Sequence, residues 1–158
     1  MSQSVRPNQS DSNAVEEFVI CDTGVLSRTF SNKPLFLAAY QRVREVGIVV
    51  ISPTIYIELL HWLTHERGRV GSLMTRREFN QNRNRLTEFP VLNYETVATT
   101  AVAVANQFLD TGLGDCFTIG VGLVFDVPIF TLNPKHFQRV GGVRLYEPAN
   151  YGELLRNT

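Results

Sequence analysis

The chain has 158 residues with 44% hydrophobic content, which is ordinary for a folded protein, so we expect one domain with a sizeable core. Its fifteen basic and fifteen acidic side chains give no net charge, which argues against binding nucleic acid through bulk charge alone. No apolar run approaches the roughly 20 residues that span a bilayer. Because the N-terminus also lacks the layout of a signal peptide, we expect a cytoplasmic protein without a membrane partner.

The domain boundaries follow from composition. A Ser-, Asn- and Gln-rich start without hydrophobic periodicity predicts a disordered tail over residues 1–15. We expect residues 16–150 to form the domain and residues 151–158 to form a C-terminal tail. The two cysteines, Cys21 and Cys116, are too few for a disulfide framework, so we interpret both as reduced packing residues.

The first half of the domain alternates strands and helices. Phe18–Cys21 is a short apolar run typical of a buried parallel strand, and Asp22 follows it directly. We expect a loop next, then a short helix that begins near Pro34. Gly47–Ile51 is the second predicted strand.

A longer helix is predicted to start at Ser52, which is a favourable N-cap, with proline in the first turn. Glu58 lies early in this helix, beside its apolar face. Residues 73–89 then predict a polar, arginine-rich helix, and residues 90–93 a weak third strand.

The second half repeats the alternation. We expect a helix over residues 96–109, and another that opens at Gly114-Asp115 and leads into a buried strand that stops at Thr131 and Asn133. A last strand is predicted over residues 143–146. This order implies βαβ units, and therefore an α/β fold with a mostly parallel sheet.

Three carboxylates lie at or near the junctions between predicted strands and helices: Asp22, Glu58 and Asp115. A right-handed parallel sheet would bring these positions to one edge. Close carboxylates repel, and a divalent cation such as Mg²⁺, which takes hard oxygen ligands, would remove that cost. Taken singly, Asp22 and Asp115 could be helix caps and Glu58 a solvated helix residue. We expect Asp110 and Asp126 to be loop and helix-end acids.

The order and spacing of these motifs resemble the PIN-domain ribonucleases, and in particular the VapC-like toxins of bacterial toxin–antitoxin pairs. The resemblance runs from about Phe18 to Pro148. It rests on an apolar strand ending at Asp22, the segment Ser52–Glu58, the unbroken run from Asp115 to Asn133, and the His136-Phe137 pair before the last strand.

The resemblance implies a PIN-like three-layer α/β/α fold with strand order 3-2-1-4-5. It also implies an Mg²⁺- or Mn²⁺-dependent endoribonuclease in which Asp22, Glu58 and Asp115 hold the metal, an RNA substrate, a neutralising antitoxin and a homodimer. Thr23 and Thr131 would then orient the acids.

One departure from the family pattern concerns the position before Phe137, where members often have a fourth acid and this chain has His136. Histidine could bind a phosphate or a softer metal, whereas Mg²⁺ prefers oxygen. The change puts a second metal in doubt. Asn133 would position substrate or water.

A basic segment is the last candidate for a functional surface, as a binding site for RNA. Six arginines against three glutamates lie between His61 and Glu88, and we consider Arg67, Arg69, Arg76 and Arg77 as contacts to the RNA backbone. The alternative is a solvated helical face, or a surface for an antitoxin or a second subunit.

Two other functions stay open. The chain could be a non-catalytic PIN-like module that binds RNA or protein, which His136 favours. It could also be an RNA-processing nuclease without an antitoxin.

Overall fold

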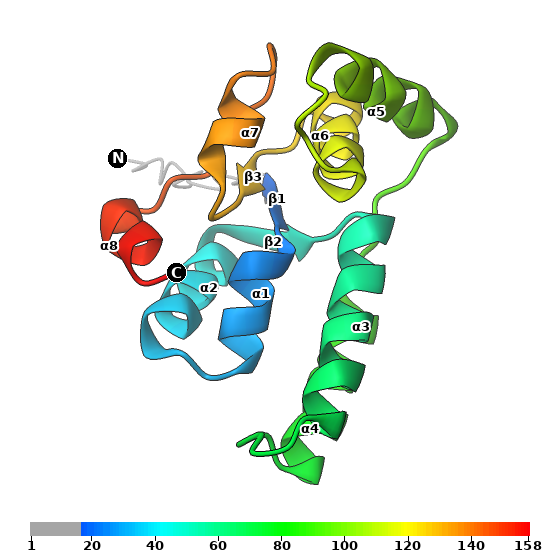
Figure 1. The fold of residues 1–158 in the computed structure, drawn as a ribbon. Helices are drawn as coiled ribbons and strands as arrows, with labels where there is room; N and C mark the ends of the chain where they lie inside the picture. The colour runs from blue at the N-terminus through cyan, green and yellow to red at the C-terminus, as the bar shows by residue number, and fades with distance from the viewer. Residues whose placement is uncertain (1–16) are drawn as a thin grey trace, which may run out of the picture.

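The computed structural model describes residues 17–158, so the predicted tail at residues 1–15 lies outside the described part (Figure 1). Three parallel strands form the sheet: β1 (Glu17–Cys21), β2 (Gly47–Val50) and β3 (Ile129–Phe130). Their order is β2-β1-β3, so β1 lies in the centre. Val19, Ile20 and Cys21 of this strand are buried, as the continuous apolar run predicts.

The sheet is extended on each side by a single bridge. Val91 pairs with Ile51 beside β2, and Leu145 pairs with Ile129 beside β3. With these bridges the order is the predicted 3-2-1-4-5, and the α/β fold is confirmed. The outer two predicted strands, over residues 90–93 and 143–146, are nevertheless reduced to one bridge each. Proline has no amide hydrogen to donate, and Pro90 stands directly before the first of these bridges.

The helices are α1 (Thr23–Phe30), α2 (Pro34–Val46), α3 (Pro53–Gly68), α4 (Arg76–Glu88), α5 (Glu95–Gln107), α6 (Leu113–Phe125), α7 (Pro134–Gln138) and α8 (Tyr151–Arg156). Figure 1 shows α3 and α4 side by side, reaching away from the strands, while α5 packs along α6. None of the helices in the described part is long and apolar enough to cross a membrane.

Two segments differ from the prediction. The loop expected after Asp22 is the helix α1, because the Asp22 side chain caps its first amide. The expected tail at residues 151–158 contains α8, whose Leu154 is fully buried. This segment is therefore packed on the domain.

The helix caps explain several other boundaries. Ser52 accepts a hydrogen bond from the amide of Ile55 and starts α3 as predicted. Thr75 and Glu78 form a capping box, so the arginine-rich helix begins at Arg76 and not at residue 73.

Candidate active site

Asp22 lies at the carboxyl end of the central strand, and both of its carboxylate oxygens are occupied. Oδ1 accepts a hydrogen bond from the Thr23 amide at 2.9 Å, and Oδ2 accepts one from the Thr131 hydroxyl at 2.8 Å. Thr131 comes directly after β3, the strand next to β1. The parallel register therefore places a hydroxyl beside the acid that ends the neighbouring strand.

Glu58 reaches the same place from α3. Its Oε2 accepts a hydrogen bond from the Thr23 hydroxyl, and its Oε1 lies so close to Gly114 that a Cβ there would clash. Two hydroxyls hold the helices in this arrangement. Ser52 is 3.0 Å from the Thr118 hydroxyl of α6, and Thr54 donates to the Gly114 carbonyl at 3.4 Å.

Asp115 lies in the first turn of α6, where the helix dipole favours a negative charge. Its Oδ2 is 3.2 Å from Nδ1 of His136, and its side chain is 29% exposed. The Asn133 side-chain nitrogen is 2.9 Å from the same His136 atom. One Nδ1 carries at most one hydrogen, so it either donates to Asp115 or accepts from Asn133, according to the tautomer.

The charges of Glu58 and Asp115 act on the carboxyl of Asp22. The pKa of Asp22 is raised to about 6, mainly because its carboxyl is buried, and also because the charges of Asp115 and Glu58 oppose its ionisation. The hydrogen bonds from Thr131 and Thr23 lower this pKa and so offset part of the rise. We call Asp22, Glu58 and Asp115 the acidic site.

The donor set of the acidic site fits a hard divalent cation. It offers carboxylate oxygens, with hydroxyls that fix the carboxylates of Asp22 and Glu58. Among residues 17–158, no three acidic, histidine or cysteine side chains already stand at ligand spacing. One or two carboxylates with water molecules is the usual protein contribution to an Mg²⁺ site, so fewer than three close ligands are compatible with such a site.

All of the predicted polar positioners lie at this site. The Thr23 hydroxyl contacts Glu58, and the Thr131 hydroxyl contacts Asp22. Asn133 and His136 contact each other, and His136 contacts Asp115. Asp110 and Asp126 instead pair with Arg139 and Arg144.

The arginines lie elsewhere. Arg67 follows Glu58 by about 13 Å along α3, at the helical rise of about 1.5 Å per residue. Its guanidinium stacks on Phe79, 5.1 Å from the ring centre, and Arg69 pairs with Glu66 at 2.6 Å. Arg76 and Arg77 are exposed at the start of α4, which Figure 1 shows at the end of the helix pair away from the strands.

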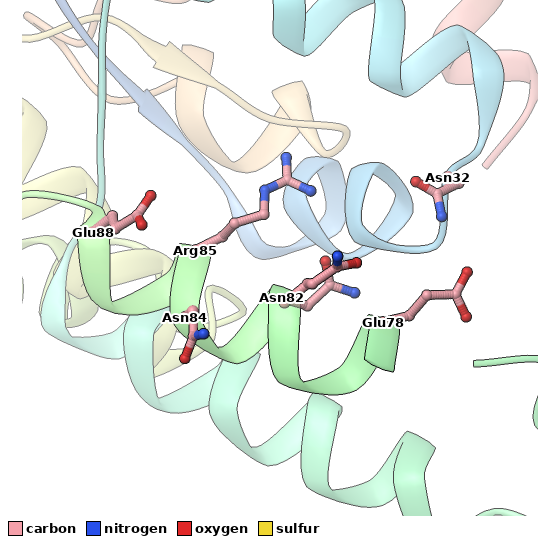
Figure 2. Close-up of a pocket in the computed structure, with 7 residues that line it drawn as sticks. Asn32, Glu78, Asn82, Asn84, Arg85 and Glu88 are labelled. Carbon is pink, nitrogen blue, oxygen red and sulfur yellow. The ribbon is translucent and has the colours of Figure 1, made fainter. Parts of the chain in front are cut away.

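Two adjoining cavities also lie away from the acidic site. Figure 2 shows the first, of about 360 Å³, between α4 and the turn that joins α1 to α2. Asn32, Glu78 and Arg85 are among its lining residues, and so is Asn82, which donates to the Phe30 carbonyl at 3.0 Å. The second cavity, of about 410 Å³, includes Trp62 in its wall.

Sequence reasoning missed one contact at the site. Tyr151 of α8 donates a hydrogen bond from its hydroxyl to the Thr131 carbonyl at 2.5 Å. No local pattern identifies this contact, because the two residues meet only when α8 folds back on β3.

The fold is shared with solved toxin–antitoxin complexes. The toxin–antitoxin complex from Klebsiella pneumoniae matches with 20% identity and a TM-score of 0.60, covering 82% of this chain and 99% of that one. VapBC-1 from nontypeable Haemophilus influenzae matches with 18% identity and a TM-score of 0.62, covering 82% and 96%. VapBC2 from Rickettsia felis, solved with a promoter DNA fragment, matches with 12% identity and a TM-score of 0.63, covering 82% and 97%.

A search of curated protein sequences found no significant match. A family model described as the PIN domain, however, matches residues 19–143, a span that contains all three carboxylates of the acidic site. The sequence motifs, the strand order and the convergence of the acids agree with this match. The chain belongs to the PIN domain family.

Proposed function

We propose that the protein is a metal-dependent endoribonuclease that acts as the toxin of a toxin–antitoxin pair. The observation that carries this proposal is the convergence of Asp22, Glu58 and Asp115, which reach one place from three different elements. A crevice that serves only structure gains nothing from mutually repelling carboxylates. PIN-domain membership and the likeness to toxin–antitoxin complexes support the same conclusion.

In this proposal Asp22, Asp115 and Glu58 hold Mg²⁺ or Mn²⁺. The bound ion would lower the pKa of a water and stabilise charge on a phosphodiester. The protein's own contribution is orientation. Thr131 fixes the Asp22 carboxylate and Thr23 fixes that of Glu58. Asn133 and His136 lie beside Asp115, where they would bind and position the RNA phosphate.

His136 argues for a single metal. It stands where a fourth acid would complete the site, and its ring meets Asp115 and Asn133. Imidazole is a poorer ligand than carboxylate for Mg²⁺. We therefore propose one ion at the acidic site, and Mn²⁺ as the better activator.

The partners are proposals of the same kind. The similar structures are described as complexes with an antitoxin or as VapBC assemblies, and we propose a corresponding antitoxin for this chain. The protein would act as a homodimer in the cytoplasm, where its RNA substrate occurs. Arg76 and Arg77 are exposed and free to meet the RNA backbone at a distance from the acids, whereas Arg67 and Arg69 are engaged with Phe79 and Glu66.

The experiment that tests the proposal is RNA cleavage by the purified protein with no metal, Mg²⁺ or Mn²⁺, beside Asp22→Asn and Asp115→Asn variants. We expect metal-dependent cleavage that both variants lose. Cleavage that persists in both variants would come from a contaminating nuclease. No cleavage by any sample, with RNA binding retained, would favour the non-catalytic module that His136 suggests.

The antitoxin needs a separate test. Co-expression with the product of an adjacent gene for a small DNA-binding protein should give a complex in which cleavage is suppressed. A nuclease that cleaves and has no such neighbouring gene would be an RNA-processing enzyme instead.

A further inference from the structure

We infer that Tyr151 of α8 is a positioning residue for the acidic site, acting through Thr131; this inference rests on the proposed nuclease function. Tyr151 donates to the Thr131 carbonyl at 2.5 Å, and the Thr131 hydroxyl donates to Asp22 Oδ2 at 2.8 Å. One residue therefore joins the C-terminal helix to the central carboxylate. Tyr151 lies beyond residues 19–143, the segment matched by the PIN domain model.

The end of β3 explains why an outside donor is needed. β3 has only two residues, so Thr131 lies past the last rung of the sheet. Its carbonyl accepts a hydrogen bond from the Tyr151 hydroxyl, where a residue within a sheet would accept one from the amide of a neighbouring strand. The Thr131 hydroxyl must point at Asp22 while it also accepts the Asn133 amide at 3.1 Å. Fixing this peptide therefore fixes Asp22 and the start of the loop that leads to His136.

Three contacts hold α8 against the rest of the domain. Leu154 is fully buried, and Asn150, the residue before α8, accepts a hydrogen bond from Arg42 of α2 at 3.0 Å. The Tyr151 ring packs against Phe130 with 6.4 Å between ring centres. The hydroxyl is thus presented by a packed ring, which restricts its direction.

Tyr146 provides a matched control. Its ring packs on the same Phe130 ring, with 5.4 Å between centres, and it is also partly buried. Among the described residues, no side-chain hydrogen bond involves its hydroxyl. Tyr146→Phe therefore removes a hydroxyl from the same aromatic cluster without touching the link to Thr131.

The test compares Tyr151→Phe with Tyr146→Phe in two measurements: RNA cleavage in Mn²⁺, and Mn²⁺ binding by calorimetry without RNA. We expect Tyr151→Phe to lower kcat by about fivefold to tenfold, the effect of one lost hydrogen bond, with KM nearly unchanged. We also expect its dissociation constant for Mn²⁺ to rise by about threefold or more, since partners that orient metal ligands tune affinity. Tyr146→Phe should match the wild type in both.

A second pair of variants tests the route. If Tyr151 acts through Thr131, Tyr151→Phe should have no further effect on kcat or on Mn²⁺ binding in a Thr131→Val background, because coupled residues are not additive. Wild-type kcat and Mn²⁺ affinity in Tyr151→Phe would overturn the inference, and so would full additivity with Thr131→Val. A wild type that neither cleaves RNA nor binds Mn²⁺ would overturn the proposed function, and this inference with it.

Discussion

The Thr23 hydroxyl donates a hydrogen bond to Glu58, and this bond joins the first residue of α1 to α3. The amide of the same threonine donates to Asp22. Thr23 therefore sets the spacing between two carboxylates that repel each other. Its position directly after Asp22 makes it a residue of the site and not only of the helix start.

Replacing Thr23 tests this relationship. Thr23→Val removes the hydroxyl but keeps the size and the amide, so Glu58 loses its donor while the cap of α1 remains. We expect kcat to fall by about tenfold, for one lost hydrogen bond to a charged group. Thr23→Ser retains the hydroxyl and should restore most of the rate. Equal rates in wild type and Thr23→Val would show that the bond is irrelevant to cleavage.

Gly114→Ala should separate activity from stability. A Cβ at this position meets the Glu58 carboxylate, which must then move away from the acidic site. The backbone is helical here, so alanine should keep or raise the free energy of unfolding, by up to about 1 kcal/mol. We expect slower cleavage with an unchanged or higher Tm. Gly112→Ala is the control for the rate of cleavage, because its added Cβ meets open space.

The raised pKa of Asp22 predicts a pH-dependent stability in the absence of metal. Its pKa in the fold is about 6 against 3.8 unfolded, so between these values the folded state holds a proton that the unfolded state has released. Stability from this group is therefore present at low pH and lost as the pH rises from about 4 to about 6, with a total near 3 kcal/mol.

Asp22→Asn isolates this contribution. At pH 7 the variant should be more stable to urea than the metal-free wild type, by up to about 3 kcal/mol, and the difference should shrink toward pH 4. Mg²⁺ or Mn²⁺ should stabilise the wild type and have little effect on the variant. If the variant were less stable than the wild type at pH 7, the charge of Asp22 would not destabilise the metal-free fold.

Restoring the fourth acid tests the role of His136. His136→Asp places a carboxylate beside Asp115, which should lower the stability of the metal-free protein by like-charge repulsion. The same change should increase the rise in Tm caused by Mg²⁺, because a further oxygen ligand becomes available. His136→Asn is the uncharged control. An identical Mg²⁺ response in both variants would show that this position does not reach the ion.

The salt dependence of KM tests whether the arginines at the start of α4 contact RNA. If Arg76 and Arg77 contact RNA phosphates, Arg76→Gln/Arg77→Gln should raise KM at low salt. The slope of log KM against log salt should then become shallower by about 0.7 for each lost contact to single-stranded RNA. Arg69→Gln, which removes an arginine already paired with Glu66, is the control. The same slope in both variants would show that Arg76 and Arg77 do not contact RNA phosphates.

The parts of the fold set by local rules could be predicted from the sequence. Ser52 caps α3 as expected, and the three residues of β1 that precede Asp22 are buried. The resemblance to PIN domains, and not a local rule, supplied the order of the strands. The convergence of the acids was also predictable, because parallel strands and the helices after them share one edge. The main prediction placed a loop where α1 lies, and only the alternative role of Asp22 as a helix cap pointed to this helix.

Tertiary contacts set the limits of prediction. Nothing near Tyr151 in the sequence indicates that its ring will pack on Phe130, so the sequence predicts a tail where α8 lies. The arginine-rich segment carries charge that suggests RNA, yet the packing of α3 on α4 places it far along the helix pair. Composition identifies such a segment, but only the three-dimensional arrangement shows what lies beside it.

The single-residue bridges at Val91 and Leu145 bear on how the protein assembles. Because the sheet ends in a single bridge on each side, its edges present few unpaired backbone groups to a strand of another chain. β-Augmentation and amyloid-like stacking are therefore both disfavoured. We therefore expect a second chain, whether a copy or an inhibitor, to dock mainly on helices. The acidic site can then be covered or released without unravelling the sheet that supports it.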